Sequence, residues 1–195
     1  MHLSSLLSIL GTVPVMLALS VPRGESLEPW EVSQVSVASP PSLTSQPSLR
    51  SYLSIIIADP NIIDGVGSKS GPINFQPSIA QCNVSWYAQD GEQPYDQSRN
   101  CTLETGYPAK WSFVVVPPNR EYGAMSGGAL TNFSVQFTLV DEIITPVNSV
   151  RKVYVGEGHF EVGENMEGLC GASGICAFSL RNESAPVLIE QTRVE

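Results

Sequence analysis

Histidine and serine could carry nucleophilic catalysis in this sequence, but they are poorly placed for it. His159 is the one histidine that remains once an expected amino-terminal signal segment is removed. The suggestive turn at 171–174 (Gly-Ala-Ser-Gly) lacks the G-x-S-x-G order of a nucleophile elbow and lies between two cysteines. A Ser-His-Asp hydrolase is therefore not predicted.

Metal ligation is the second chemistry that His159 could serve. His159 and Glu161 alternate along one face of a predicted strand, opposite Phe160 and Val162, which would place two ligands side by side. A solvated strand face explains the same pattern and is favoured, so no metal site is predicted. The cysteines lack the C-x-x-C spacing of a structural zinc site. No phosphate-binding or dinucleotide glycine motif occurs, and no cofactor is expected.

Acidic side chains could supply the carboxylate pair of a glycoside hydrolase, because such pairs meet only in the folded chain. None of the candidates is distinguished by its sequence context. They are Asp59, Asp64, Asp90, Glu92, Asp141, Glu142, Glu157 and Glu161. Residues 59–65 loosely resemble a calcium loop but lack the alternation and final Glu of an EF-hand, so a polar hairpin loop is favoured. We predict that the protein is not an enzyme.

The charge balance excludes two classes of partner. The 195-residue chain has 10 Lys and Arg against 19 Asp and Glu, a formal net charge of −9. Nucleic acids and anionic membrane surfaces both attract basic patches, which this composition does not supply. We therefore predict no nucleic-acid partner and no membrane partner.

Residues 1–20 contain an apolar run that ends on the small residues Ala18 and Ser20, as in a secretory signal peptide. A membrane anchor is the alternative, but Gly11 and Pro14 interrupt a run that is already short for a span of about 20 residues. Cleavage after Ser20 would release a secreted, extracellular protein. No later stretch of the sequence is long and apolar enough to cross a bilayer.

Four cysteines in a secreted chain predict two disulfides, because the extracellular medium keeps thiols oxidised. Three pairings are possible. We favour the sequential one, which joins Cys82 to Cys101 and Cys170 to Cys176.

Four N-glycosylation sequons begin at Asn83, Asn100, Asn132 and Asn182. Sequons that are used mark exposed positions. Asn132 fits this role because it shares a polar strand face with Ser134. Asn100 is the least suited, because its neighbour Cys101 must stay close to a disulfide partner.

Composition divides the remaining chain in two. Residues 21–50 contain five prolines among many serines, with few apolar residues in any period. Such a segment buries too little apolar surface to offset the entropy of ordering it, so we predict a disordered Pro/Ser-rich arm. The folded domain is expected to comprise residues 51–195.

Within this domain the apolar pattern is that of strands. The clearest lies at 132–139, where every second residue is apolar. This strand is expected to span 130–140 in full. The other predicted strands are 52–58, 73–79, 83–87, 110–116, 150–155, 158–162, 175–180 and 186–191. No window has a convincing helical period. We predict an all-β fold, an antiparallel β-barrel or β-sandwich with two disulfides.

Several of these features together resemble one family. They are the signal segment, the early pair Cys82 and Cys101 around a polar loop, the aromatic strand 111–113, and the late pair Cys170 and Cys176 before a closing strand at 187–189. In this order the chain is similar to small secreted fungal proteins related to the major allergen of Alternaria, over about residues 51–194. The resemblance implies a secreted β-barrel with two intradomain disulfides that interacts with plant defence proteins. It implies no binding residues, because the late cysteine loop is short and the Pro/Ser arm is additional.

Two functions follow as hypotheses. The first is a secreted, non-catalytic binding protein, effector-like or allergen-like, that interacts with host extracellular proteins. The alternative is a carbohydrate-binding or cell-wall-associated module. It rests on Trp86, Tyr87, Tyr95 and Tyr107 in or near the stapled loop, where exposed rings would stack on sugars. Against it, Trp86 and Tyr87 are expected to be ordinary strand residues, and Trp86 and Trp111 core or barrel-mouth aromatics.

Replacing Cys82 or Cys101 with Ser should lower the free energy of unfolding by about 2 to 5 kcal/mol and reduce secreted yield, because the bridge constrains the unfolded chain. Thermal unfolding of the purified variants measures the effect. Unchanged stability would show that this pairing is wrong or unimportant.

Overall fold

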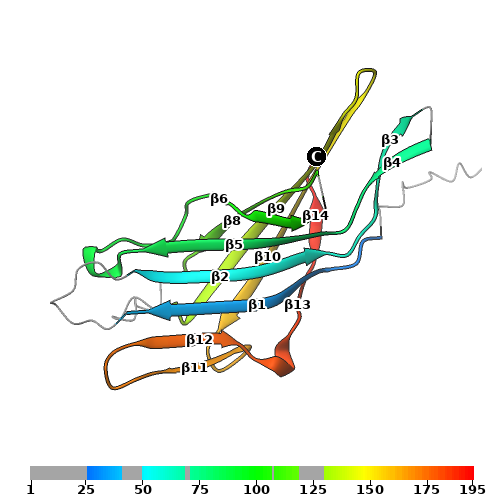
Figure 1. Cartoon of the computed structure of the whole chain (residues 1–195). Coiled ribbons are helices and arrows are strands. Elements are labelled where there is room, and N and C mark those ends of the chain that lie inside the picture. Colours follow the sequence, from blue (N-terminus) through cyan, green and yellow to red (C-terminus); the bar gives the residue numbers. More distant parts are fainter. Residues whose placement is uncertain (1–25, 41–49, 69–70, 107, 119–129) are drawn as a thin grey trace, which may run out of the picture.

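The computed structural model describes residues 26–40, 50–68, 71–106, 108–118 and 130–195. Within these ranges the chain forms fourteen strands, the two short 3-10 helices Ala88–Asp90 and Asn182–Ser184, and no α-helix. The strands pair antiparallel in two large sheets and one small one. The predicted all-β antiparallel class is confirmed (Figure 1).

The first sheet is built around the N-terminal strand. Its order is β11 (Met166–Cys170), β12 (Cys176–Leu180), β1 (Trp30–Ser39), β2 (Ser51–Asp59), β5 (Ser78–Trp86) and β7 (Thr102–Thr105). A further strand, β13 (Val187–Ile189), pairs with the beginning of β1, whereas β12 pairs with its end. Both therefore share the edge of β1 that faces away from β2.

The second sheet is dominated by one long hairpin. Its order is β14 (Gln191–Arg193), β10 (Ser149–Glu161), β9 (Asn132–Ile144), β8 (Lys110–Val116) and β6 (Arg99–Asn100). The β9–β10 hairpin extends beyond the rest of the molecule (Figure 1). A separate two-stranded sheet joins β3 (Ile63–Ser68) to β4 (Gly71–Phe75).

The two large sheets form layers whose strands run in crossing directions (Figure 1), and their inward side chains share one hydrophobic core. Trp30 of β1 meets Trp111 of β8 edge to face, with ring centroids 4.7 Å apart. The indole nitrogen of Trp111 donates a hydrogen bond of 2.9 Å to the hydroxyl of Ser78 on β5. Trp111 thus links both sheets, and its one polar atom is satisfied in the core. Neither of these sheets closes on itself among the described strands.

The described chain passes between the two large sheets five times, and at two of these crossings a single residue separates the strands. Cys101 lies between β6 of the second sheet and β7 of the first, and its backbone N–H donates to the carbonyl of Trp111 at 2.9 Å. The disulfide from Cys101 to Cys82 of β5 fixes this crossing. The other single-residue crossing is Glu190, between β13 and β14. The sequential cysteine pairing is confirmed, since Cys170 and Cys176 form the second bridge.

A glycine on β10 makes room for the crossing at Glu190. A Cβ atom at Gly156 on β10 would lie 2.8 Å from Ile189 Cγ2 and 3.1 Å from Trp30 Cζ3. Because that position carries no side chain, β13 can cross closely over β10 on its way into the second sheet.

The prediction of a disordered arm over 21–50 is wrong for Trp30–Ser39, which form the central strand β1. Its buried apolar residues are Trp30, Val32, Val35 and Val37, spaced by two, three and two positions. A register shift between Val32 and Gln34 adds the extra residue, which breaks the alternation that identifies a strand. Prolines 29 and 40 lie just outside the strand, where no ladder N–H is needed. The domain boundary at residue 51 is therefore also wrong.

Other strand boundaries differ in the same way. The predicted strand 73–79 spans the end of β4 and the beginning of β5, and 83–87 is the second half of β5. The predicted strands 150–155 and 158–162 are one strand, β10, because its glycines face the core instead of ending it. The region 186–191 is divided between β13 and β14. Strands β3, β6, β7 and β11 were not predicted.

Replacing Trp30 with Ala should lower the free energy of unfolding by about 3 to 5 kcal/mol, because it removes a fully buried ring and its contact with Trp111. The control is Glu31→Ala, an exposed position on the same strand, which should change stability by less than about 0.5 kcal/mol. Urea unfolding followed by tryptophan fluorescence and circular dichroism measures both. Equal stabilities of the two variants would contradict the placement of β1 in the core.

Candidate functional site

A concave surface lies on the first sheet, over strands β1, β2, β11 and β12. It is an open groove of ≈ 650 Å³. Among its lining residues are Ser36, Tyr52, Glu167, Leu169, Phe178 and Ser179. Tyr52 is 47% exposed and Leu169 71% exposed, so the groove offers apolar and hydroxyl groups together. Such a mixture is typical of a binding surface.

The hairpin of β11 and β12 forms one wall of the groove. Cys170 and Cys176 are register partners joined by a disulfide, which holds the hairpin closed at its tip. Gly168 has a φ of +148°, and a Cβ atom there would lie 2.1 Å from the carbonyl oxygen of Ala177. Only glycine permits this close approach of the two strands, so a side chain at position 168 would disrupt the wall. Its outer strand, β11, ends the described sheet.

The aromatic residues predicted to stack on sugars do not form an exposed platform in the described structure. Trp86 and Trp111 are both 3% exposed and belong to the core. Tyr95 is half-buried, and burial raises the pKa of its hydroxyl. Tyr87 is also half-buried, with the guanidinium of Arg50 lying 4.2 Å from its ring centroid. Tyr107 lies outside the described residues.

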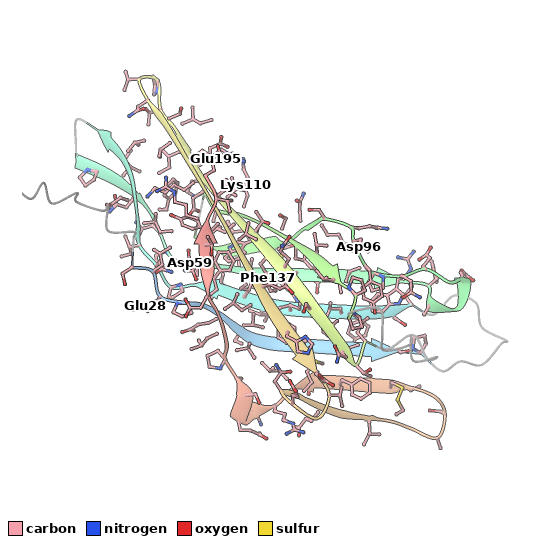
Figure 2. All side chains as sticks on the ribbon, turned by 180° about the vertical axis from the view of Figure 1, so that it is seen from behind. Glu28, Asp59, Asp96, Lys110, Phe137 and Glu195 are labelled. Carbon is pink, nitrogen blue, oxygen red and sulfur yellow. A yellow bond between two sulfur atoms is a disulfide. The ribbon has the colours of Figure 1, made fainter. Side chains whose placement is uncertain are left out.

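Two of the eight candidate carboxylates are buried, and a lysine accompanies them. Asp59, at the end of β2, and Asp141, on β9, are each 3% exposed, and Lys152 on β10 is 6% exposed. Asp141 and Lys152 are register partners, so both side chains point to the same, inner face of the second sheet. Asp59 approaches from the first sheet, beside Glu28 at one end of the core (Figure 2). Among the other six, Glu142 and Glu161 are partly exposed and the rest exposed.

The pKa values of both buried acids are raised, as expected for carboxyl groups in an apolar environment. Burial, and then the negative charge of Asp59, raise the pKa of Asp141 to about 7, and the Lys152 ammonium opposes this. Burial also raises the pKa of Asp59, against the hydrogen bonds that its carboxylate accepts from the backbone and side chain of Asn61. Protonation of Asp141 therefore removes one negative charge from this buried group.

This acid pair lies apart from the groove, whose lining includes neither Asp59 nor Asp141. The Asn61 amide also donates to the backbone carbonyl of Glu28 and accepts from its N–H. Residues 59–61 thus fasten the beginning of the described chain to the end of β2, which is a structural role.

His159 contacts a different serine from the one that the sequence suggested. Ser173 lies at the tip of the disulfide hairpin, whereas His159 Nδ1 lies 3.4 Å from the hydroxyl of Ser134 on β9. His159 Nε2 lies 3.4 Å from Glu161 Oε2. Glu164, which follows in the turn after β10, brings a third ligand atom to this group. Sequence reasoning found His159 and Glu161 but missed Ser134 and Glu164.

The four sequon asparagines lie in different environments. Asn83, Asn100 and Asn182 are exposed. Asn132 is partly buried, and its side-chain oxygen has no hydrogen-bond partner in the described structure. Asn83 pairs with Ser54 of β2 on the outer face of the first sheet. A glycan on Asn83 would therefore lie on the sheet face that carries the groove.

The stability of the protein should fall as pH rises from about 4 to about 8. The carboxyl of Asp141 has a pKa of about 7 in the folded chain against 3.8 unfolded, so the folded chain binds the proton more tightly. Its contribution to stability is full below the unfolded value and is lost as pH rises through the folded one. Asp59, whose pKa is also raised, acts in the same direction.

Melting temperatures measured across this range test the assignment. Asp141→Asn should reduce the pH dependence, because it removes the titrating group and keeps its shape. Asp64→Asn, an exposed acid on β3, should retain the wild-type slope. An identical slope in all three proteins would show that Asp141 does not titrate in this range.

Comparison of the chain with models of protein families, with curated proteins and with solved structures finds no match. The family resemblance noted in the sequence therefore stays a prediction. The described part of the chain contains no helix with the length and apolar character needed to span a membrane.

Proposed function

We propose that this chain is a secreted, non-catalytic binding protein with a β-sandwich fold, and that the groove on its first sheet contacts a partner protein. The two open sheets over a shared core support a sandwich rather than a barrel. The two disulfides and the signal-like amino-terminal segment support an extracellular location.

The observation that carries the proposal is the combination of a groove with an edge strand. Among the described strands β11 pairs only with β12. Beyond Met166, whose carbonyl accepts a hydrogen bond from the N–H of Gly163, its other edge offers backbone N–H and C=O groups to an extended segment of a partner. Leu169 on β11 and Tyr52, across the groove on β2, expose apolar surface that a partner would bury. Ile175, 50% exposed near the tip of the same hairpin, extends this surface.

Charge narrows the class of partner. The chain carries a net charge of −9, and Glu167 contributes a carboxylate to the groove. A partner with a basic surface would be attracted over a long range and would complement this wall. In line with the resemblance to small secreted fungal proteins, the proposed partner is an extracellular host protein, which makes the chain effector-like or allergen-like.

A second candidate is binding to a wall polysaccharide. Tyr52 supports it, because one exposed ring beside the hydroxyls of Ser36 and Ser179 offers both stacking and hydrogen bonds to a sugar. The buried Trp86 weakens it, because the ring that the sequence put forward for stacking lies in the core.

A paired capture experiment distinguishes the two candidates. The secreted protein is incubated with plant extracellular fluid and, separately, with insoluble chitin, β-glucan and cellulose. A captured protein is then purified, and its affinity is measured for the wild type and three variants. Leu169→Glu and Tyr52→Ala alter the groove, whereas Ile144→Glu alters an equally exposed position at the far end of the β9–β10 hairpin.

For the protein partner, Leu169→Glu should weaken binding by about tenfold or more, and Ile144→Glu should leave it unchanged. Retention on one polysaccharide that Tyr52→Ala abolishes would support the second candidate instead. Equal binding by all variants would place the interaction elsewhere and overturn the assignment of the groove.

A further inference from the structure

The second sheet carries a group of side chains that the proposed binding function does not use. His159 and Glu161 are on the outer face of β10, and Glu164 lies in the turn that follows it. The imidazole nitrogen and the two carboxylate oxygens all lie within 4.8 Å of one another. They come from one short segment with the pattern H-x-E-x-x-E.

We propose that His159, Glu161 and Glu164 form a binding site for a divalent transition-metal ion of the zinc type. One imidazole and two carboxylates are a ligand set that Zn²⁺ accepts, with further positions left to water or to a ligand from a partner. Two glutamates beside an imidazole also provide the negative charge that attracts a dication.

The imidazole is already oriented for this role. Ser134, on the neighbouring strand, is the register partner of His159, and its hydroxyl lies 3.4 Å from Nδ1. With Nδ1 directed to Ser134, Nε2 faces Glu161 at 3.4 Å. Metal-binding histidines commonly use one ring nitrogen for the metal and bind a polar group with the other, which fixes the ring. A neutral imidazole that donates from Nδ1 to Ser134 leaves the Nε2 lone pair for the metal.

The backbone that carries the two glutamates is held independently of their side chains. The Asn165 amide donates to the carbonyl of His159 at 2.8 Å and accepts from the N–H of Glu161 at 3.0 Å. The N–H of Glu164 donates to the carbonyl of Glu161 at 3.1 Å. Gly163, at a φ of +101°, allows the sharp turn. The turn therefore returns Glu164 toward His159 without requiring a metal to fold it.

Zinc binding would require only a small movement of the ligand atoms. Ligand atoms around a tetrahedral zinc ion are about 3.4 Å apart, given metal–ligand distances of about 2.0 to 2.2 Å. The carboxylates have to move inward from separations of up to 4.8 Å. Glu164 is exposed and Glu161 partly exposed, so both side chains have room to change rotamer.

The same strand supplies a matched control. Glu157 points to the same outer face as His159 and Glu161, because residues two apart on a strand share a face. It is exposed but does not belong to the group of three. Glu157→Gln changes the net charge as Glu164→Gln does, so it separates a specific site from general attraction to an acidic protein.

Isothermal titration of the secreted, tag-free protein with ZnCl₂ tests the proposal, with CaCl₂ and MgCl₂ as comparisons. We expect one Zn²⁺ bound per chain and weaker binding of Ca²⁺ and Mg²⁺. His159→Gln and Glu164→Gln should each lose measurable one-site binding, and Glu157→Gln should bind as the wild type does. Circular dichroism checks that each variant is folded. Zn²⁺ binding that survives His159→Gln, or no binding by the wild type, would overturn the site.

Discussion

The contact between the two tryptophans is the constraint on which the rest of the fold depends. Trp30 and Trp111 meet in the core from different sheets, and the indole N–H of Trp111 reaches Ser78 on the first sheet. Two large rings at this point set the spacing between the layers, because a packed interior leaves no room for another arrangement. The inward residues of β1, β2, β5, β8 and β9 then fill the space around them.

The same layering explains the position of the covalent bonds. A chain that changes sheet leaves the hydrogen-bond ladder at the crossing and has to be held by other contacts. At Cys101 a disulfide to Cys82 and a backbone bond to Trp111 supply them. The bridge between Cys170 and Cys176 has a different role, because it closes a hairpin at the edge of the first sheet. One disulfide thus ties the chain segment that crosses between the sheets to the first sheet. The other closes the hairpin that forms one wall of the groove.

The charged groups are divided between the core and the surface. Asp59, Asp141 and Lys152 are buried together, and the raised pKa of Asp141 limits the number of charges that the core has to hold. This arrangement suits an acidic medium, in which the neutral form of Asp141 is favoured. On the outer faces, Glu167 lies beside the groove and Glu161 and Glu164 lie beside His159, where solvent, partners and ions can reach them.

The sequence by itself determined the features that depend on local pattern and composition. These are the all-β class, the cysteine pairing between near neighbours, and strands such as β2, β8 and β9, whose alternation is regular. Closely spaced cysteines and an alternation of apolar and polar residues can be recognised in the sequence without knowing what packs against them.

Tertiary structure decided what depends on register and on breaks in that pattern. Strand β1 was missed because one extra residue at its bulge disrupts the alternation, and only its pairing with β2 and β12 reveals it as the centre of a sheet. Lys152 meets Asp141, and Ser134 meets His159, because β9 and β10 pair in one particular register. A shift of one residue would turn each of these side chains to the opposite face. Side chains become a site only when the register is fixed, and the register is set by the packing of the two sheets.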